Sequence, residues 1–406
     1  MKLLVIDTSY NLDDIKKKKL YQAIYSRDLD GFFKKVWSVH PFANILTNSK
    51  LKNTFGKYKI NRLNKNHIFI EGKFGRFKLL KFIPLINFML SQIEILFYLK
   101  KIVIDEKINF IKSGDPLYNS ILAYILSRMT KIPFIIRVSG NFDKIYKDTN
   151  LPIMKRMFFF RSIEKIIERF MFKKANYVVA PNRDNLNYAI KNGAKKNKTK
   201  IIRYGSLLFK NHLVAPKKRI DPYFFEKSLG INKKYKIIIY VGRLEEVKRV
   251  RDLIKIYKKI NIKNLKLLVV GNGSLNKFLK EEIQKKKLLK NIILLGEKDQ
   301  NWLSRCLPNC NCFIATHTGR ALAEAAFAGI PVAGYNIDWH SEIIKNDRDG
   351  LLVNTGDTKK LASAIKKILN NKKLAKKFSL NIRLKAEKIL SPSVIVKNEI
   401  EIFKKL

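Results

Sequence analysis

The chain has 406 residues, 46% of them hydrophobic and 29% charged, and this ordinary globular composition excludes a mainly disordered or fibrous protein. The length predicts two or three domains with sizeable cores. Lys and Arg number 83 against 33 Asp and Glu, a formal net charge of +50, which favours a polyanionic partner such as nucleic acid, an anionic membrane or an acidic substrate. Biased codon usage would also raise Lys, Ile and Asn together, so the placement of the lysines has to decide between these explanations.

The N-terminal segment is predicted to form a strand. Residues 3–7 form an apolar run that is too short for a signal peptide and predicts a first buried strand. The most hydrophobic window, residues 77–99, contains Lys78, Lys81, Pro84 and Glu94, which argues against a membrane-spanning helix. We therefore expect a cytoplasmic protein.

Along the chain, short β-branched runs alternate with longer helical patterns rich in Lys, Leu and Ile. This alternation predicts parallel sheets joined by crossover helices. The expected strands of the first half are residues 3–7, 36–40, 67–71, 110–113, 134–138, 177–180 and 200–203. Those of the second half are residues 237–241, 265–270, 292–295, 312–315, 331–333 and 351–353. The sequence thus predicts two α/β domains of similar size.

The alternation breaks between residues 211 and 236. Pro216, the basic run 217–219, Pro222 and Gly230 are turn and linker signals there. We expect a first domain over residues 1–215 and a second over residues 216–390. A C-terminal helix over residues 391–406 is expected to pack back on the first domain.

Cysteine and histidine give no sign of a metal site. Cys306, Cys310 and Cys312 are too few for a disulfide framework, and no further Cys or His pair completes a zinc pattern. The five histidines are scattered, without the spacing of a metal site or a catalytic triad. We expect neither a metal nor a cofactor.

The sharpest chemical signal lies in residues 241–248. Gly242 ends a strongly β-forming run and lets another group approach the backbone closely. Arg243 and Lys248 flank the entrance to the next helix, at the edge of an open α/β sheet where ligands bind. A planar guanidinium and a compact ammonium together suit a diphosphate. The alternative is an ordinary strand-to-helix turn with solvated basic side chains.

A glycine turn follows the next expected strand. Gly271 and Gly273 begin a pattern like the dinucleotide-binding fingerprint, but Asn276 stands where the third glycine belongs. A tight turn at the same edge of the sheet is the expected structure.

A third segment, residues 316–326, follows the strand expected at 312–315. Gly319 opens a helix whose first turn offers backbone N–H groups to an anion such as phosphate. Glu324 is expected about one turn inside, where it can accept hydrogen bonds from two vicinal hydroxyl groups. The alternative is a surface carboxylate. His317 and His340 lie near this predicted pocket, and a structural role is the commoner one for such histidines.

With these segments in order, the sequence resembles a family 4 (group 1) glycosyltransferase of the GT-B fold. The four matching stretches are residues 240–248 (YVGRLEEVK), 267–274 (LLVVGNGS), 321–335 (ALAEAAFAGIPVAGY) and 339–357 (WHSEIIKNDRDGLLVNTGD). The resemblance is strong over about residues 237–370. It implies two Rossmann-like, doubly wound domains that face each other across a cleft.

The resemblance also implies transfer of a sugar from a nucleotide-sugar donor of the UDP or GDP type, with retention of anomeric configuration and no essential metal. Arg243 and Lys248 would be the catalytic residues, because they would neutralise the leaving diphosphate. Glu324 would hold the ribose hydroxyls. The implied donor-binding residues are Gly242, Gly271, Gly273, Thr316, His317, Thr318, Gly319, Arg320 and Glu324.

Two departures from the family pattern bear on function. Thr316 stands where the family usually has an acid that contacts the donor sugar, and a neutral hydroxyl bonds more weakly. This implies a different donor sugar, a subgroup variation or lost activity. In the first domain, Ser139 or Asn141 takes the place of a family histidine, and Asp115 and Arg137 are expected to face the cleft. These four residues are the acceptor-side candidates.

Residues 77–101 mix apolar side chains with Lys78 and Lys81. The family that the sequence resembles includes enzymes that act on lipid-linked acceptors. In that light, this pattern is interpreted as an amphipathic helix that lies on an anionic membrane surface without crossing it. A core helix of the first domain is the alternative. The expected partners are a nucleotide sugar, a glycan or lipid-linked acceptor and the membrane, and the expected location is cytoplasmic, peripherally on the inner face of the membrane.

The leading hypothesis is a retaining glycosyltransferase that extends a glycan in cell-surface polysaccharide or glycolipid assembly. A GT-B pseudoenzyme that binds a nucleotide sugar without transfer is the alternative, motivated by Thr316. A basic nucleic-acid-binding protein, motivated by the charge of +50, is a third hypothesis, and the sequence shows neither a helix-turn-helix nor a zinc pattern to support it.

Overall fold

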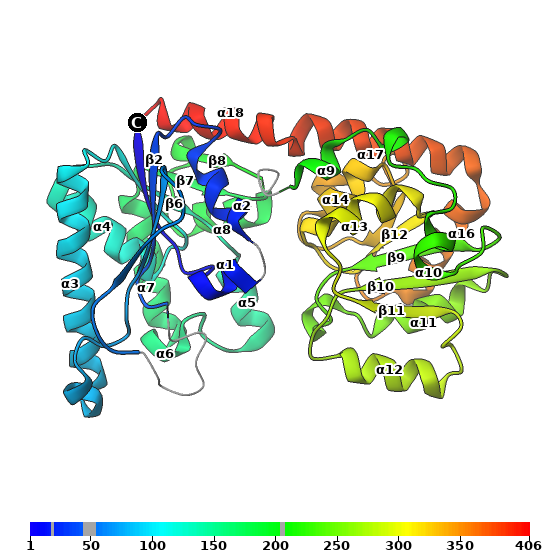
Figure 1. The fold of residues 1–406 in the computed structure, drawn as a ribbon, viewed down its shortest axis with the longest axis horizontal. Helices are drawn as coiled ribbons and strands as arrows, with labels where there is room; N and C mark the ends of the chain where they lie inside the picture. The colour runs from blue at the N-terminus through cyan, green and yellow to red at the C-terminus, as the bar shows by residue number, and fades with distance from the viewer. Residues whose placement is uncertain (18–19, 44–53, 204–207) are drawn as a thin grey trace. The chain divides into compact units, whose positions relative to one another are not determined.

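The computed structural model describes residues 1–17, 20–43, 54–203 and 208–406 (Figure 1). The chain forms two compact units. The first comprises Met1–Arg203 together with Ile395–Leu406, and the second comprises Tyr204–Val394. Both ends of the chain therefore belong to the same unit.

The first unit is built on an eight-stranded sheet with the order β3-β4-β2-β1-β5-β6-β7-β8. Its strands are β1 (Lys2–Ile6), β2 (Lys35–His40), β3 (Lys59–Arg62), β4 (His67–Glu71), β5 (Phe110–Ser113), β6 (Phe134–Arg137), β7 (Tyr177–Ala180) and β8 (Thr199–Ile201). Neighbouring strands pair in parallel, except that β3 runs antiparallel to β4 at one edge. The sequence predicts all of these strands except β3.

Helices connect the strands of the first unit and cover both faces of its sheet. They are α1 (Leu12–Lys17), α2 (Tyr21–Tyr25), α3 (Pro84–Asp105), α4 (Tyr118–Thr130), α5 (Phe142–Thr149), α6 (Lys155–Phe158), α7 (Arg161–Lys174), α8 (Arg183–Lys191) and α18 (Pro392–Phe403), with short 3₁₀ turns that include η2 (Lys78–Phe82). Because successive strand residues point to opposite faces, β1 contributes to two cores. Leu4 and Ile6 pack with residues of α3, α4 and α7, whereas Leu3 and Val5 pack with residues of α18.

The C-terminal helix α18 is integral to the first unit. Its Ile402 and Phe403 are buried, and the Phe403 ring meets that of Phe33 edge-on with 4.8 Å between centroids. Glu399 on α18 forms a buried ion pair with Lys112 on β5. Burial alone would raise the pKa of Glu399, but the Lys112 ammonium holds it below its usual value.

The second unit is built on a six-stranded parallel sheet with the order β11-β10-β9-β12-β13-β14. Its strands are β9 (Lys236–Val241), β10 (Leu265–Val270), β11 (Ile292–Gly296), β12 (Cys312–Ala315), β13 (Val332–Tyr335) and β14 (Leu351–Val353). The first three strands extend the sheet to one side and the last three to the other. This is the strand order of the doubly wound dinucleotide-binding fold, and its direction reverses between β9 and β12.

Helices again lie on both faces of the second sheet. They are α9 (Lys210–Leu213), α10 (Phe224–Leu229), α11 (Asp252–Ile260), α12 (Asn276–Lys285), α13 (Gln300–Cys306), α14 (Arg320–Ala328), α15 (His340–Ile343), α16 (Thr358–Asn370) and α17 (Lys372–Leu390), with 3₁₀ turns η5 (Pro216–Lys218), η6 (Glu246–Lys248) and η7 (Leu307–Asn309). Ile238 and Tyr240 of β9 pack with residues of α11 and α16, and Ile237 and Ile239 pack with residues of α13 and α14.

The expected linker between residues 211 and 236 is folded into the second unit. Here α9 packs against α13 and α14, and α10 contacts α13. His212 and Phe224 are buried in these contacts. Turn residues such as Pro216 therefore separate short helices within this unit, and the linker interpretation is wrong for this segment.

Two buried histidines predict loss of stability in acid. Burial lowers the pKa of both His40, at the end of β2, and His340, at the start of α15, to about 4. In the unfolded chain each binds a proton near its ordinary pKa of 6.5, so the free energy of unfolding falls as the pH drops from 6.5 towards 4. Between pH 7 and pH 5 we expect each histidine to lower the free energy of unfolding of its unit by about 2 kcal/mol.

Urea unfolding at pH 7 and pH 5 measures this loss. His40→Leu and His340→Leu should each reduce the pH dependence of the transition of their own unit, whatever their effect at pH 7. Transitions that keep the same midpoint at both pH values in the unsubstituted protein would contradict the expectation.

Candidate functional site

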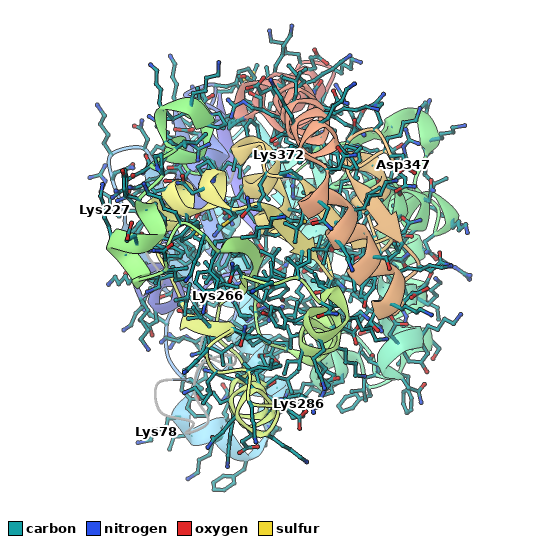
Figure 2. All side chains as sticks on the ribbon, turned by 90° about the vertical axis from the view of Figure 1, so that its right-hand side faces the viewer. Lys78, Lys227, Lys266, Lys286, Asp347 and Lys372 are labelled. Atoms are coloured by element: carbon teal, nitrogen blue, oxygen red, sulfur yellow. The ribbon has the colours of Figure 1, made fainter. Side chains whose placement is uncertain are left out.

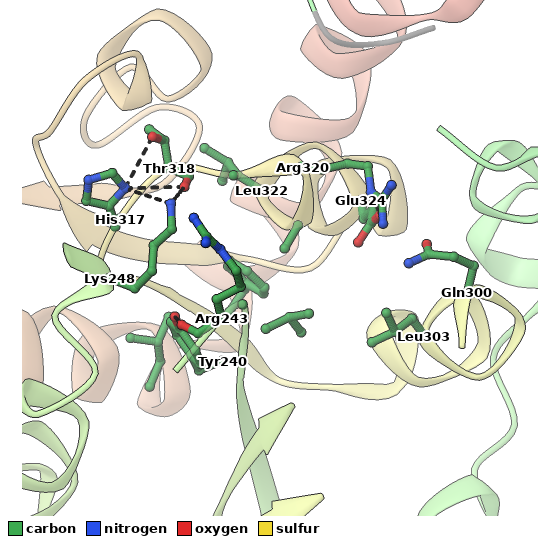
Figure 3. Close-up of a pocket in the computed structure, with 16 residues that line it drawn as sticks. Tyr240, Arg243, Lys248, Gln300, Leu303, His317, Thr318, Arg320, Leu322 and Glu324 are labelled. Carbon is green, nitrogen blue, oxygen red and sulfur yellow. Dashed lines mark hydrogen bonds and ion pairs between the residues drawn. The ribbon is translucent and has the colours of Figure 1, made fainter. Parts of the chain in front are cut away.

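A cavity of about 310 Å³ lies at the carboxyl ends of β9 and β12, where the strand order of the second sheet reverses. Open α/β sheets bind ligands at this position, because the loops that leave the two strands diverge and open a crevice. The lining residues are Tyr240, Val241, Gly242, Arg243, Lys248, Gln300, Leu303, Phe313, Ile314, His317, Thr318, Gly319, Arg320, Ala321, Leu322 and Glu324. The cavity thus gathers most of the donor-binding residues named from the sequence (Figure 3).

The loop after β9 carries Gly242 and Arg243 into the cavity. The Tyr240 hydroxyl donates to the Arg243 carbonyl at 3.1 Å, and the Leu244 amide donates to the Asn272 carbonyl at 2.9 Å. These bonds fix the backbone of the loop while the Arg243 side chain stays exposed. A fixed backbone with an exposed guanidinium suits a group that contacts an incoming anion.

Gly271 and Gly273 do not line the cavity, but their backbone packs closely against this loop. A Cβ atom at Gly271 would lie 1.9 Å from the Gly242 carbonyl oxygen, and the φ angle of Gly271 is +136°. A Cβ atom at Gly273 would lie 2.5 Å from the Leu244 carbonyl oxygen. The two glycines are therefore required for close backbone packing, a role that the donor-binding interpretation did not include.

The Lys248 ammonium is held in the cavity by the opposite loop. Its Nζ donates to the Thr318 carbonyl at 2.7 Å and lies 3.2 Å from His317 Nδ1. Burial lowers the pKa of Lys248, and the nearby Arg243 guanidinium lowers it further. An anion bound between the two cations would relieve both effects, so the pair is electrostatically prepared for a phosphate group.

The loop after β12 supplies the facing wall. The Thr318 hydroxyl donates to Asp338 Oδ2 at 2.8 Å, and His317 Nε2 lies 3.6 Å from the same oxygen. Asp338 therefore holds both side chains in place. Gly319 then caps α14, whose first turn points backbone N–H groups towards the cavity end of the helix.

Thr316 lies behind the cavity rather than on its surface. It is fully buried, and its hydroxyl donates to the Lys248 carbonyl at 2.7 Å. The side chain thus positions the backbone that carries the Lys248 ammonium. The structure gives Thr316 a supporting place, whereas the family pattern implied a contact with the donor.

Glu324 marks the other end of the cavity. Its side chain is 2% exposed and lies one turn into α14, as the sequence predicts. Arg320 Nε donates to Glu324 Oε1 at 2.8 Å. A buried carboxylate at one end and two cations at the other match a ligand with hydroxyl groups beside an anionic group.

Gln300 and Leu303 also line the cavity, and no sequence signal identified them. Both lie on α13, which follows the edge strand β11, and Gln300 at its start approaches Arg320 and Glu324 of α14. Only Asp299, which caps α13 by accepting from the Trp302 amide at 2.7 Å, gives a local sign of where this helix begins. The wall they form depends on tertiary packing between the two helices.

The acceptor-side candidates lie in the first unit, at the carboxyl ends of β5 and β6. Asp115 is buried, accepts from the Leu117 amide at 2.7 Å and has its pKa raised by burial to about 7. Asn141 caps α5 through the Lys144 amide at 3.1 Å. Arg137 Nη2 donates to the Ile202 carbonyl at 3.3 Å, and Ser139 is exposed. The structure therefore gives Asp115 and Asn141 local structural bonds and leaves their acceptor role a prediction.

In the parts of the chain that the structure describes, no three His, Cys, Asp or Glu side chains come together in a way that could hold a metal ion. Cys306, Cys310 and Cys312 are buried free thiols.

Comparison with known proteins shows which proteins the chain is similar to. Residues 223–385 match the family model described as glycosyl transferases group 1. Among characterised relatives, the chain is 25% identical over 232 residues to the N-acetyl-alpha-D-glucosaminyl L-malate synthase of Bacillus anthracis, covering 51% of this chain and 61% of that protein. It is 27% identical over 303 residues to the capsular polysaccharide biosynthesis glycosyltransferase CapM of Staphylococcus aureus, covering 71% and 75%.

Solved structures match the fold along the full length. The Anabaena protein HepE in complex with UDP has a TM-score of 0.72 at 15% identity, with 100% of both chains covered. The lipopolysaccharide outer core galactosyltransferase WaaB in its apo form has a TM-score of 0.67 at 15% identity, also with 100% of both chains covered. The predicted fold class is thus confirmed.

Proposed function

Since residues 223–385 match the family model of the group 1 glycosyltransferases and the chain has the GT-B fold, we propose that this protein transfers a sugar from a nucleotide-sugar donor to a glycan or lipid-linked acceptor, with retention of anomeric configuration. The observation that carries the proposal is the cavity between β9 and β12, where Arg243 and Lys248 oppose Glu324. A nucleoside diphosphate presents its ribose hydroxyls and its phosphates in this relation.

In the proposed complex, Arg243 and Lys248 contact the diphosphate. Negative charge grows on this group as the bond to the sugar breaks, and preorganised cations stabilise such a charge most when they sit in a partly buried site. The N–H groups at the start of α14, after Gly319, face the same anion. Glu324 accepts hydrogen bonds from the ribose. No metal is needed in this arrangement, because the two side chains supply the positive charge.

The relatives suggest where such a transfer belongs. One of them is the N,N'-diacetylbacillosaminyl-diphospho-undecaprenol alpha-1,3-N-acetylgalactosaminyltransferase of Campylobacter jejuni, 24% identical over 331 residues. Its acceptor is a lipid-linked sugar, and CapM acts in capsule synthesis. We place the present chain in the same class of reaction, with the donor UDP- or GDP-linked and the reaction on the cytoplasmic side of a membrane.

Titration calorimetry of the full chain with UDP and GDP tests the donor proposal. Binding of one of the two, with competition by a sugar nucleotide carrying the same base, is expected. Transfer to a lipid-linked acceptor, measured by loss of the nucleotide sugar, then separates an active enzyme from a protein that only binds. The position of Thr316 makes this second measurement necessary. Absence of binding to both nucleotides would refute the proposal.

Replacing Glu324 with glutamine is expected to weaken nucleotide binding by roughly tenfold or more, because the bonds from the ribose would no longer reach a charged acceptor. The substitution keeps the shape of the side chain in its buried site. Calorimetry of the variant against the unsubstituted protein measures the effect. The matched control is Glu281→Gln on α12, which lies outside the cavity. Equal affinities for Glu324→Gln and the unsubstituted protein would exclude a ribose contact.

A surface of the first unit supports the membrane part of the proposal. The helix α4 packs against both α3 and α7, and the three helices carry apolar side chains on their solvent sides. We call this surface, with the preceding turn η2, the three-helix face. Its exposed apolar side chains are Leu79, Phe82, Leu85, Ile86, Met89, Leu90, Ile93, Phe97, Ile104, Ile125, Met129, Ile163, Ile166 and Phe170. Leu79 is 91% exposed and Phe82 is 81% exposed, whereas such side chains are usually buried.

The helix α3 has one side in the core and an apolar side that is exposed. Its Ile95 and Leu99 lie in the core of the first unit, while Phe97 on the opposite side is 58% exposed. The segment is not one continuous helix, because η2 ends and α3 begins around Ile83. None of the described helices is both long and apolar enough to cross a bilayer. This geometry suits a helix that lies in the interface.

Charge favours an anionic lipid surface as the occupant of the three-helix face. Lys78, Lys81, Lys100, Lys101, Arg128, Lys165, Arg169, Lys173 and Lys174 lie on η2, α3, α4 and α7. Of the acidic residues on the same elements, Glu164 and Glu168 are buried and paired with Arg161, and Glu94 is paired with Arg76. Asp105, at the end of α3, is exposed, and Lys165 forms an ion pair with Asp143 of α5. Basic side chains also project from the second unit, at Lys227, Lys286 and Lys372 (Figure 2). The second unit also has exposed apolar side chains near basic ones, such as Leu289, Leu380 and Leu384, but the three-helix face gathers a larger number of them.

A further inference from the structure

The buried carboxylate of Glu324 is held by side chains from two helices. Arg320, one turn earlier on α14, donates from Nε to Glu324 Oε1 at 2.8 Å. Gln300, the first residue of α13, places its amide nitrogen 3.0 Å from the same oxygen. Figure 3 shows Gln300 extending from α13 towards Arg320 and Glu324 on α14. Two donors from different elements thus converge on one oxygen of the carboxylate.

The neighbours of Gln300 determine how its amide is turned. With the nitrogen facing Glu324, the amide oxygen accepts from Arg320 Nη2 at 3.0 Å, and the nitrogen also lies 2.9 Å from His212 Nε2. The opposite orientation would set the amide oxygen against the carboxylate and its nitrogen against the guanidinium, which satisfies neither group. In the satisfied orientation His212 Nε2 is the acceptor, so the imidazole is neutral.

The chemistry of His212 agrees with this assignment. The residue lies on α9, is fully buried, and has its pKa lowered by that burial. A neutral imidazole can accept from the Gln300 amide at neutral pH, whereas an imidazolium could not. The four side chains therefore form one chain of hydrogen bonds, from His212 through Gln300 to Glu324 and Arg320. The Nδ1 atom of His212, which carries the proton of the neutral imidazole, has no hydrogen-bond partner among the described residues.

This network leaves the second oxygen of Glu324 for a ligand. Both donors bond Oε1, and no donor among the described residues bonds Oε2. Glu324 and Gln300 both line the cavity, as does Leu303, one turn after Gln300 on the same side of α13. Arg320 by itself is a long and partly exposed side chain, so it restrains the carboxylate less than the pair does.

We propose that Gln300 is a positioning residue for ribose recognition: it fixes the Glu324 carboxylate with Oε2 towards the nucleotide, and the buried His212 fixes Gln300. The inference rests on the proposed function, in which Glu324 receives the ribose hydroxyls. It adds that the selectivity for ribose over deoxyribose depends on a residue that need not touch the hydroxyls. Loss of the Gln300 amide then removes this selectivity while leaving the phosphate contacts intact.

The test compares UDP with 2′-deoxy-UDP, or GDP with 2′-deoxy-GDP if the chain binds the guanine nucleotide, by calorimetry on the full chain. The unsubstituted protein should bind the ribonucleotide roughly tenfold or more tightly, as expected for a bond to a charged acceptor. In Gln300→Met, which keeps the length of the side chain, the ratio should fall below about threefold. The affinity for the deoxynucleotide should change little.

Two further variants complete the design. Gln300→Asn keeps an amide, but its side chain is too short to reach Glu324. This variant should lose the preference for the ribonucleotide in the same way. It serves as the test if the Gln300→Met protein does not fold. Asn301→Met changes the neighbouring exposed amide, which lies outside the cavity, and should keep the ratio of the unsubstituted protein.

The outcomes separate the inference from the function on which it rests. An unsubstituted protein that prefers the ribonucleotide, with folded Gln300 variants that keep the same preference, would overturn the positioning role alone. Variants that lose affinity for both nucleotides by one common factor would also overturn it, because this is the result of a general disturbance of the cavity. An unsubstituted protein that binds neither ribonucleotide would overturn the donor proposal together with the inference.

Discussion

Arg243→Ala and Lys248→Ala are each expected to lower turnover by at least ~100-fold, the scale of removing one preorganised group that stabilises charge in a transition state. Lys248 is already fixed in the cavity by the Thr318 carbonyl, so its ammonium needs no rearrangement when charge appears on the diphosphate. Arg243 extends from a braced loop and can follow the charge as it moves. Initial rates at saturating donor and acceptor, compared with the donor dissociation constants, measure the effect.

Arg251→Ala and Lys255→Ala are the matched controls for these two variants. Arg251 lies shortly after the same loop, where it pairs with Glu246 at 2.8 Å, and Lys255 is an exposed residue of α11. Neither lines the cavity, and both variants should keep turnover within a factor of about two, as expected of surface changes away from a site. If Arg243→Ala and Lys248→Ala raise the Michaelis constant while turnover stays near normal, the two cations bind substrate without stabilising the transition state.

Replacing Leu79, Phe82 and Leu85 together with serine is expected to reduce binding to anionic vesicles by at least about 100-fold. Each of these side chains is more than two thirds exposed, so its transfer from water into the interface is worth roughly 1.5–3 kcal/mol, and its loss should leave the core unchanged. Flotation with vesicles that contain an anionic lipid measures the bound fraction. Vesicles of neutral lipid report the apolar contribution without the charge.

A comparison of lysine sets separates this surface from the general excess of charge. Replacement of Lys78, Lys81, Lys100 and Lys101 by glutamine should release the protein, since each Lys close to an anionic surface contributes about 1 kcal/mol. Replacement of Lys285, Lys286, Lys287 and Lys290, in and after α12 of the second unit, should matter much less. Equal losses from the two sets would mean that the charge is diffuse and that the three-helix face is not the docking surface. Self-association of the protein in place of vesicle binding would point to a second copy as its occupant.

The sequence predicted the sheets well because buried parallel strands are continuous apolar runs. Residues 237–241 and 265–270 are such runs, and the structure has β9 and β10 there. The antiparallel edge strand β3 was not predicted, because its residues, KINR, are mostly polar and largely exposed, and only their pairing with β4 makes them a strand. An edge strand of this kind forms because it pairs with a neighbouring strand, and the residues of the segment itself do not reveal that pairing.

The candidate site was predictable where it depends on chain order. Loops at the carboxyl ends of adjacent parallel strands must meet, so Arg243, Lys248 and Glu324 could be assigned to one cavity before any geometry was known. The detailed arrangement of these residues could not be predicted from the sequence. The place of Thr316 beneath the Lys248 carbonyl and the approach of Gly271 to Gly242 depend on distances of a few ångströms between separate loops. The place of Gln300 depends on how α13 approaches α14, and no sequence pattern indicates this tertiary contact.

The placement of α18 has a consequence for synthesis on the ribosome. The first unit needs Ile402 and Phe403 to cover Leu3, Val5 and Phe110, yet the whole second unit is translated between these segments. One apolar face of the N-terminal sheet must therefore stay uncovered while about half of the chain is still being made, whereas the second unit has all of its own residues earlier. Nascent chains generally fold from the N-terminal domain onwards. Here the unit that begins first is expected to be completed last, and chains that stop short of α18 should expose that face to chaperones and to one another.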